Sequence, residues 1–364
     1  MRFGSDGSWA TPEMKAAFLE APGKMVVREV PAPKLRGEGL LCEVLACGIC
    51  GSDLRAYVRG PGSRRREPGH EVVLRVIESS RAGDGAEGGF PEVGTRLAVS
   101  SVSCGVCGEC LRGDEHMCEK RSHVGFEAPS GFSELALVPE KTVLYGAVFQ
   151  IPPVIPDAAA SLVEPLACVI CGHEKIHVSP GDTVVVLGAG PAGCMHGIVA
   201  KARGASQVIL VDVKDSRLRL APPSSWDVKI NPAETSIKEA VFDLTGADGA
   251  DVVVVACASG EAQSQAVSLS RKGGQVLLFS GLPPETRLVP LDVELIHRRE
   301  IRIVGSRNSG RRHFKKAIDM LVHEPSRFEG IVTHVLPLDE GDKGFQIALR
   351  GEGLKVVVAP AGQP

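Results

Sequence analysis

A glycine-rich turn, G-A-G-P-A-G, follows the apolar run T-V-V-V-L and precedes the helix-compatible segment C-M-H-G-I-V-A-K-A. Gly188 permits a tight turn, Gly190 lets the backbone approach a pyrophosphate, and Gly193 allows the helix to pack close to the strand. Pro191 and Ala192 open the helix, whose N-terminus then faces the anion. Such turns also occur without a ligand, but the strand before this one and the helix after it favour a dinucleotide-binding unit.

The next predicted strand, Q-V-I-L-V-D-V, carries an acidic residue, Asp212, near its end. The Asp212 carboxylate is placed to accept hydrogen bonds from both ribose hydroxyls and would repel a 2′-phosphate, so the sequence favours NAD over NADP. Lys214 and Arg217 lie nearby and soften that preference. Ala258 and Gly281, which follow further predicted strands, complete the residues that we assign to the cofactor.

The pattern around this turn differs from that of the rest of the chain. From Asp182 onward, strands alternate with helices, which indicates a parallel sheet in a doubly wound domain. Residues 14 to about 155 instead contain short strands separated by Gly and Pro, typical of an all-β or barrel-like domain. A helical stretch is predicted from Ala158 to His177, and the last sixty or so residues are expected to return to the first domain.

We therefore predict an α/β protein with two domains, as a length of 364 residues also favours. The predicted parts are a flexible extension (residues 1–13), a partly open, β-barrel-like catalytic domain (14–157 and 306–364) and a doubly wound Rossmann domain (158–305).

Composition excludes several classes of protein. A hydrophobic content of 43% with 23% charged residues is typical of a globular chain. The net charge of −3 provides no basic field, so we expect a small-molecule partner rather than nucleic acid or a membrane. The first thirteen residues lack the apolar core of a secretory signal, and a cytoplasmic location is expected.

Eleven cysteines, an odd number in a chain without a recognisable signal, favour thiols and metal over disulfides. Four of them fall within fifteen residues: Cys104, Cys107, Cys110 and Cys118. Two-residue gaps let successive thiolates turn toward one tetrahedral ion, which predicts a closed structural zinc site. An iron–sulfur cluster is the alternative, because four cysteines also hold those clusters.

A second set of possible ligands is spread along the chain. Cys50 lies in G-I-C-G-S-D, His70 and Glu71 in P-G-H-E, and Glu164 in V-E-P-L-A-C. One thiolate, one imidazole and carboxylates suit a zinc ion that keeps a position open for an alcohol oxygen. Zinc acidifies that oxygen, a nicotinamide ring accepts the hydride, and Ser52 is placed to pass the hydroxyl proton outward.

Taken together, these motifs resemble the zinc-containing medium-chain dehydrogenase family, over nearly the whole chain from Met14. The order G-I-C-G-S-D, G-H-E, cysteine lobe, S-G-F-S-E, V-E-P-L-A-C and G-A-G-P-A-G carries the resemblance, and E-P-L at Glu164 resembles the polyol and threonine dehydrogenase branch. The resemblance implies a GroES-like catalytic domain, two zinc ions per chain, NAD, and a homodimer or homotetramer. Cys50, His70, Glu71 and Glu164 would surround the catalytic zinc, some through water.

The sequence also predicts the ligands of the catalytic zinc and the class of substrate. Because Glu71 directly follows His70, we expect Cys50, His70 and Glu164 to be the main protein ligands of the catalytic zinc. We expect a polyol, cyclitol or sugar-like secondary alcohol, interconverted with its ketone. The alternatives are a threonine-type amino-alcohol dehydrogenase, a two-cysteine zinc site using Cys168 or Cys171, and a nucleotide-binding structural or regulatory protein without catalysis.

Two departures from the family pattern favour the non-catalytic alternative. Arg55 stands where a histidine usually ends the proton relay, and Leu74 stands where a glycine is usual. Arginine stays charged at neutral pH and does not shuttle protons. Neither change removes a metal ligand.

Overall fold

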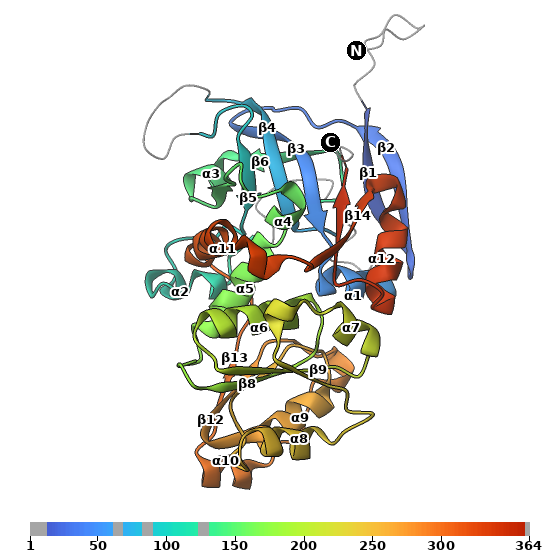
Figure 1. Cartoon of the computed structure of the whole chain (residues 1–364). Coiled ribbons are helices and arrows are strands. Elements are labelled where there is room, and N and C mark those ends of the chain that lie inside the picture. Colours follow the sequence, from blue (N-terminus) through green and yellow to red (C-terminus); the bar gives the residue numbers. More distant parts are fainter. Residues whose placement is uncertain (1–12, 61–67, 82–89, 123–130, 361–364) are drawn as a thin grey trace, which may run out of the picture.

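The computed structural model describes residues 13–60, 68–81, 90–122 and 131–360. The predicted extension of residues 1–13 lies outside the described residues, except for Glu13. Two sheets form the two ends of the molecule, and the helices α5 (Val163–His173) and α6 (Pro191–Ala202) lie between them (Figure 1).

The first sheet contains six parallel strands in the order β10-β9-β8-β11-β12-β13. Its strands are β8 (Thr183–Leu187), β9 (Gln207–Val211), β10 (Val228–Ile230), β11 (Ala250–Val255), β12 (Ser270–Leu278) and β13 (Arg302–Gly305). The runs of Val, Ile and Leu in β8, β9 and β11 are buried on both faces, which explains why they do not alternate with polar residues. The strand order reverses between β8 and β11, and ligands of such sheets bind at the carboxyl ends beside that point.

The second sheet is built from both ends of the chain. Six of its strands follow the order β14-β15-β3-β4-β5-β7, and β6 pairs with β3 off this path. Its strands are β3 (Gly39–Gly48), β4 (Glu71–Ser79), β5 (Arg96–Val99), β6 (Leu135–Pro139), β7 (Val148–Gln150), β14 (Val332–Pro337) and β15 (Lys355–Ala359), beside a separate hairpin of β1 (Glu13–Ala21) and β2 (Lys24–Pro31). The last sixty residues therefore do return to this sheet, where β15 pairs antiparallel with β3. The domain boundaries themselves stay a prediction.

The helices have the following bounds: α1 (Gly51–Arg59), α2 (Gly108–Leu111), α3 (Glu140–Leu144), α4 (Asp157–Ala160), α7 (Asp215–Leu220), α8 (Ile237–Leu244), α9 (Gly260–Leu269), α10 (Val293–Arg299), α11 (Arg311–His323) and α12 (Gly341–Arg350). The predicted helical stretch from Ala158 to His177 consists of two helices, α4 and α5, with a break between them, and α5 ends at His173. At the break the Ser161 hydroxyl donates to the carbonyl of Ala158 at 2.7 Å, a local bond that competes with a continuous helix.

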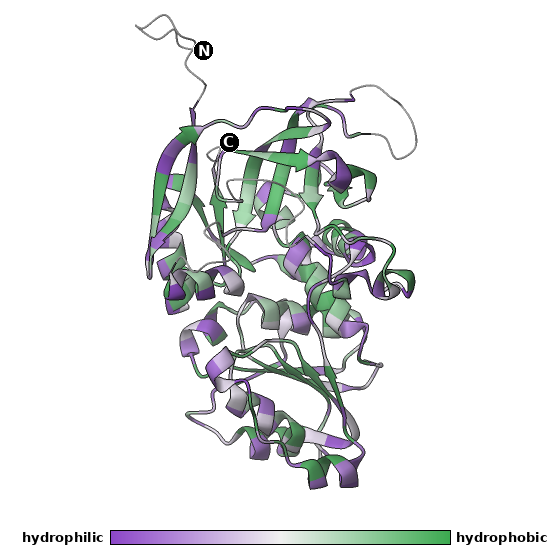
Figure 2. Cartoon of the chain, turned by 180° about the vertical axis from the view of Figure 1, so that it is seen from behind, coloured by the Kyte–Doolittle hydropathy of each residue, from purple (hydrophilic) through white to green (hydrophobic). Residues whose placement is uncertain are grey.

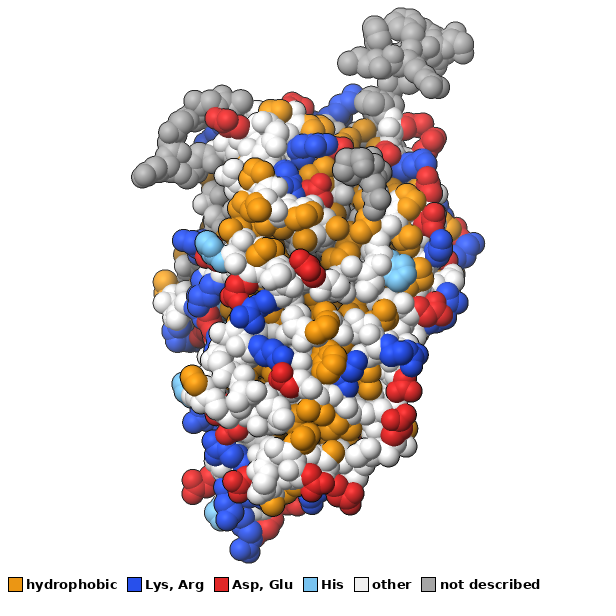
Figure 3. Space-filling model, in the orientation of Figure 1, with side chains coloured by type: hydrophobic (Ala, Val, Ile, Leu, Met, Phe, Trp, Pro, Cys, Tyr) orange, Lys and Arg blue, Asp and Glu red, His pale blue; other side chains and the backbone are white. Residues whose placement is uncertain are grey.

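Apolar side chains of α5 join the two ends of the molecule. One buried cluster contains Leu166 and Val169 of α5, Val73 of β4 and Val184 of β8. Strands of both sheets are hydrophobic in Figure 2, whereas the outer helices carry polar faces. Basic and acidic side chains are interspersed over the face shown in Figure 3, in line with the small net charge. No helix of the described residues is long and apolar enough to cross a membrane.

Candidate active site and metal centres

A cavity of about 1410 Å³ lies between the two sheets. Segments that follow β3, β8, β11, β12 and β13 line it, so it includes the carboxyl ends of the parallel strands. Its volume exceeds the roughly 300–1,000 Å³ of a typical small-ligand pocket, which leaves room for a dinucleotide and a second molecule.

Cys50 enters this cavity from the end of β3, where it begins α1. Its backbone amide donates to Asp53 Oδ2 at 3.0 Å, and the amide of Gly69 donates to Asp53 Oδ1 at 3.1 Å. The same Oδ1 lies 3.6 Å from Nδ1 of His70. The buried Asp53 carboxylate therefore connects the Cys50 segment to the His70 segment through these contacts.

Glu71 follows His70 at the start of β4 and makes a buried ion pair. Its Oε2 lies 2.5 Å from Nζ of Lys355, which also donates to the carbonyl of Ile49 at 3.2 Å. A Cβ at Gly48 would lie 2.1 Å from that same Oε2, so the glycine of G-I-C makes room for the carboxylate. Burial alone would lower the pKa of Lys355, but the charge of Glu71, followed by that of Cys50, holds the pKa above its ordinary value.

Glu164 lies near the start of α5 and lines the same cavity. Burial raises the pKa of its carboxyl, and the charge of His70 opposes the rise. The Cys168 thiol, one helical turn later, lies 3.6 Å from Oε1 of Glu164 and 3.6 Å from Oγ of Ser309. Burial and then the charge of Glu164 raise the pKa of Cys168 well above its ordinary value, which keeps the thiol protonated.

The donor atoms near Cys50 fit a zinc ion. One ligand atom each from Cys50, His70 and Glu71 lies within 4.8 Å of the others. The grouping differs from our expectation, because it includes Glu71 and leaves Glu164 farther away. The reason is that Lys355 holds the Glu71 carboxylate at the start of β4. The roles of the two glutamates stay a prediction.

Ser52 lines the cavity two residues beyond Cys50. Its hydroxyl is buried and has no hydrogen-bond partner among the described residues. An unpaired buried hydroxyl costs free energy unless a ligand or water satisfies it. The Ser52 hydroxyl is therefore available to a molecule bound beside Cys50.

The glycine turn after β8 has the geometry of a pyrophosphate cradle. Gly188 has φ +113°, which favours glycine, and a Cβ at Gly193 would lie 1.7 Å from the Gly188 carbonyl oxygen. A Cβ at Gly190, in contrast, would meet nothing within 4 Å and would occupy the space above the helix N-terminus. Gly188, Gly190, Pro191, Ala192, Ala258 and Gly281 all line the cavity.

Asp212 follows β9 and is buried beside this turn. Its two carboxylate oxygens accept the amides of Ala189 and Lys214, both at 2.8 Å, and Arg217 lies 3.7 Å away. Each oxygen keeps further acceptor capacity for a ribose hydroxyl.

The four-cysteine lobe brings all four sulfur atoms within 4.8 Å of one another. The Sγ atoms of Cys104 and Cys110 are 3.9 Å apart, and those of Cys107 and Cys110 are 3.5 Å apart. A tetrahedron of Zn–S bonds of about 2.3 Å has edges of about 3.8 Å, so the sulfur positions fit a closed zinc site. Hydrogen bonds from the amides of Val106 and then Cys107 lower the pKa of Cys104 to about 6.

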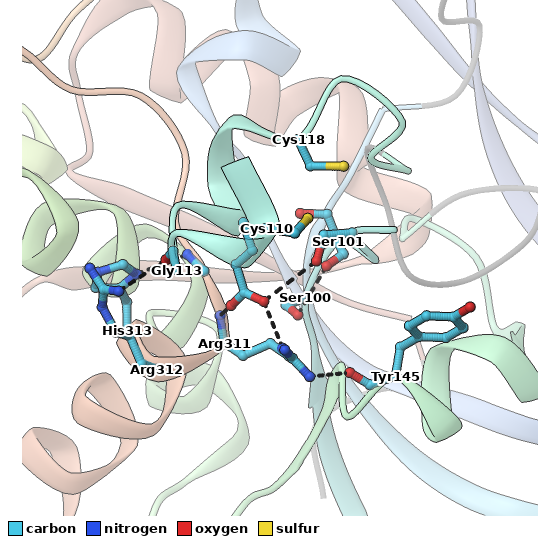
Figure 4. Close-up of polar contacts among 12 residues, drawn as sticks. Ser100, Ser101, Cys110, Gly113, Cys118, Tyr145, Arg311, Arg312 and His313 are labelled. Atoms are coloured by element: carbon cyan, nitrogen blue, oxygen red, sulfur yellow. Dashed lines mark hydrogen bonds and ion pairs between the residues drawn. The ribbon is translucent and has the colours of Figure 1, made fainter. Parts of the chain in front are cut away.

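Helix α11 anchors this lobe to the rest of the molecule (Figure 4). The backbone amide of Arg311 donates to Glu115 Oε1 at 2.5 Å, and the side-chain Nε of Arg311 donates to Glu115 Oε2 at 2.8 Å. Arg311 also donates to the carbonyl of Tyr145, and Arg312 donates to that of Gly113. Asp114 of the lobe lines the cavity, so the lobe forms part of the cleft wall.

Comparison with known families agrees with this geometry. Residues 37–152 match the alcohol dehydrogenase GroES-like domain, and residues 191–323 match the zinc-binding dehydrogenase family. A sorbitol dehydrogenase of Halalkalibacterium halodurans is 31% identical over 345 residues, which cover 93% of this chain and 96% of that protein. The chain belongs to the zinc-binding alcohol dehydrogenase family. Its cofactors are accordingly zinc and NAD(P), and the predicted combination of a GroES-like and a Rossmann domain is confirmed.

Other relatives of this dehydrogenase have different names. An erythritol/L-threitol dehydrogenase of Mycolicibacterium smegmatis is 31% identical, over 96% of this chain and 98% of that protein. An L-threonine 3-dehydrogenase of Coxiella burnetii is 28% identical, over 93% of this chain and 96% of that protein. A solved structure, a putative zinc-binding dehydrogenase from Sinorhizobium meliloti bound to NADP, has a TM-score of 0.82 and 28% identity, over 96% of this chain and all of that one.

Two residues of this dehydrogenase's site are absent from the sequence predictions. Asp53 is the last residue of G-I-C-G-S-D, and its spacing of three from Cys50 marks a helix-capping position that could have been recognised. Lys355 is the single charge in the apolar run L-K-V-V-V-A. A lone lysine in a buried strand signals a buried partner, but it does not say which one.

Proposed function

We propose that this dehydrogenase interconverts a polyol-like secondary alcohol and its ketone, with NAD as the hydride acceptor and zinc at the Cys50 site. The observation that carries the proposal is the grouping of Cys50, His70 and Glu71, with Glu164, on the cavity that the glycine turn also lines. When bound there, zinc would acidify an alcohol oxygen, and NAD would accept the hydride from the alcohol carbon.

The residues of the chain supply position and proton transfer. Asp53 orients the Cys50 and His70 segments, and Lys355 holds the Glu71 carboxylate away from solvent. Ser52 would accept the hydroxyl proton of the substrate, because its own hydroxyl is otherwise unpaired. A carboxylate at Glu164 in place of a second thiolate would leave the ion more positive and favour a polyol that offers a neighbouring hydroxyl.

The departures at Arg55 and Leu74 are compatible with catalysis. Leu74 is fully buried and pairs with Val44 across β3 and β4, so it packs in the core. Arg55 is exposed on α1 and lines the cavity. Because arginine does not shuttle protons, the proton from Ser52 would leave through water or the ribose hydroxyls.

A substrate screen tests the proposal. NADH formation is measured with polyols, cyclitols, aminocyclitols and amino alcohols, and we expect turnover of at least one polyol or cyclitol. Glu164→Ala should lower zinc content and abolish turnover while NAD binding persists. Cys171→Ser, a buried change on the same helix outside the cavity lining, should keep both the zinc content and the turnover. Preference for L-threonine would support the threonine-type alternative. NAD binding without turnover of any alcohol would support the non-catalytic one.

The same Glu164→Ala variant distinguishes a catalytic zinc held by Glu164 from one held by a second cysteine. Loss of catalytic zinc in Cys168→Ser together with a harmless Glu164→Ala would show a site of the two-cysteine type. The polyol proposal would then lose its main support. The cytoplasmic location and the homodimer or homotetramer stay predictions.

A further inference from the structure

Two arginines lie on the substrate side of the cavity and take no part in the proposed chemistry. Arg121 follows the four-cysteine lobe, and Arg307 follows β13. Both line the same cavity as Cys50 and Glu164. They come from segments nearly two hundred residues apart, so only the tertiary fold places them in one cleft.

Arg121 is half-buried and Arg307 is exposed, and the described residues provide no ion-pair partner for either guanidinium. Burial first, and then the charge of the exposed Arg307, lower the pKa of Arg121, so the fold holds the Arg121 charge at a cost in free energy. Such a cost persists when a ligand of opposite charge offsets it.

The cofactor does not account for Arg121. The glycine turn and Asp212 mark where the pyrophosphate and ribose of a dinucleotide would lie. The arginine beside that position is Arg217, which lies 3.7 Å from Asp212. The largest electrostatic influences on Arg121 include Glu164 and Cys168 of α5. Arg121 therefore lies on the catalytic side of the cleft, and Arg307 enters the same cavity from the segment after β13.

The charge of the cleft differs from that of the whole chain. The chain has 41 Lys and Arg against 44 Asp and Glu. Among the described residues, the cavity lining has six Lys and Arg against three Asp and Glu. Of the three acidic residues, Glu71 is paired with Lys355. The other charged residues of the lining therefore carry a net positive charge, which favours binding of an anion.

The two arginine segments are also held against one another. Asn308 has a left-handed backbone, φ +61°, directly after Arg307. Three residues later, Arg311 (labelled in Figure 4) is bound to Glu115 of the lobe. A Cβ at Gly310 would lie 2.7 Å from Glu115 Oε1. The Arg307 segment is thus fixed to the lobe that precedes Arg121, which pre-organises the pair for a ligand.

We propose that Arg121 and Arg307 bind an anionic group of the substrate, a carboxylate or a phosphate, so that the preferred alcohol is an acidic polyol derivative and not a neutral polyol. This inference rests on the proposed function. Guanidinium groups suit both anions, because their planar donors match carboxylate and phosphate oxygens. A substrate held by its charged end would present a hydroxyl of its chain to the Cys50 site.

The test compares a neutral hexitol, the aldonate of the same chain length and the hexitol phosphate. Turnover is measured by NADH formation, and binding by calorimetric titration in the presence of NADH, with which an alcohol does not react. We expect at least one of the two anions to exceed the hexitol in kcat/KM, and the better anion identifies the group. Arg121→Gln and Arg307→Gln should each raise KM for that anion about 10- to 100-fold, as loss of a charged hydrogen bond implies, with little change for the hexitol or NAD. Arg302→Gln, an exposed change outside the cavity lining, should leave all values unchanged.

The outcomes separate this inference from the proposed function. Turnover of the hexitol at least as efficient as that of both anions would overturn the inference and keep the function. An equal loss for neutral and anionic substrates in Arg121→Gln would also overturn it, because a merely structural residue would have that effect. Binding of an anion that depends on Arg121, without turnover of any alcohol, would support the anion site and overturn the proposed function.

Discussion

At the scale of single residues, the ion pair between Glu71 and Lys355 is the most deeply buried of the catalytic cleft, with exposed side-chain fractions of 1% and 4%. Lys355→Met should lower the free energy of unfolding by about 3–5 kcal/mol, because the Glu71 charge is left buried without its partner. The exposed pair of Lys343 and Glu340 provides the matched control, and Lys343→Met should cost less than about 1 kcal/mol. Urea unfolding of the zinc-loaded proteins measures both values. Equal losses of unfolding free energy in the two variants would contradict the prediction that the buried pair stabilises the fold more than the exposed one.

Asp212 is the residue that should decide the choice between NAD and NADP. The unaltered enzyme should show a higher kcat/KM with NAD, and Asp212→Ala should narrow the difference, because the carboxylate no longer repels a 2′-phosphate. The variant should also lose about 1–3 kcal/mol of stability, since the amides of Ala189 and Lys214 lose their acceptor. Asp215→Ala, an exposed change three residues on, serves as the control and should alter neither quantity. Equal use of both cofactors by the unaltered enzyme would show that this reasoning is wrong.

At the scale of elements, the four-cysteine lobe contains only the four-residue α2 and a three-residue 3₁₀ turn, Glu115–Met117. Helices this short are not stable alone, so the lobe depends on its metal and on α11. Cys107→Ser should remove about one of two zinc ions per chain, as metal analysis would show, and should lower the melting temperature. The catalytic zinc should stay, and Cys171→Ala should keep the full metal content. A normally folded Cys107→Ser protein with unchanged zinc would disprove the structural-zinc interpretation.

At the scale of the whole molecule, two buried histidines should make the fold sensitive to acid. His173 of α5 and His196 of α6 lie between the two sheets, their ring centroids 5.1 Å apart, with no hydrogen-bond partner for any ring nitrogen among the described residues. Burial lowers the pKa of His196 to about 3, and burial and then His196 lower that of His173 well below its ordinary value. Below the unfolded pKa of about 6.5 the unfolded chain binds protons that the folded chain excludes, so stability falls as pH falls from about 6.5 toward 3.

The slope should approach about 1.4 kcal/mol per pH unit for each histidine below pH 6.5. His196→Leu should reduce this slope, whereas His323→Leu, an exposed change at the end of α11, should not. Denaturant midpoints measured from neutral pH down to about pH 5 test the difference, and loss of zinc in acid affects all three proteins alike. Identical slopes for the unaltered protein and His196→Leu would contradict the prediction.

Local patterns in the sequence were sufficient to predict several parts of the fold. The strand T-V-V-V-L, the glycine turn and the following helix are β8, the Gly188 turn and α6, because turn geometry and apolar runs depend on neighbours in the chain. The four cysteines were predicted as a cluster for the same reason, since their spacing brings the thiols together without help from distant segments. The break between α4 and α5 was not predicted, because a single side-chain hydrogen bond of Ser161 marks it.

The sequence by itself determined the two kinds of domain, the dinucleotide turn and the four-cysteine cluster, each of which arises from a pattern of residues close together in the chain. It also supplied the residue types of the second metal site, which lie far apart in the chain. Only the tertiary structure decided which distant charges meet in the cleft. Lys355 reaches Glu71 because β15 pairs with β3, and Arg307 faces the same cavity as Arg121 because α11 binds the lobe. Electrostatic energies depend on distances of a few ångströms between such groups, and those distances arise only when strands and helices from both ends of the chain pack together.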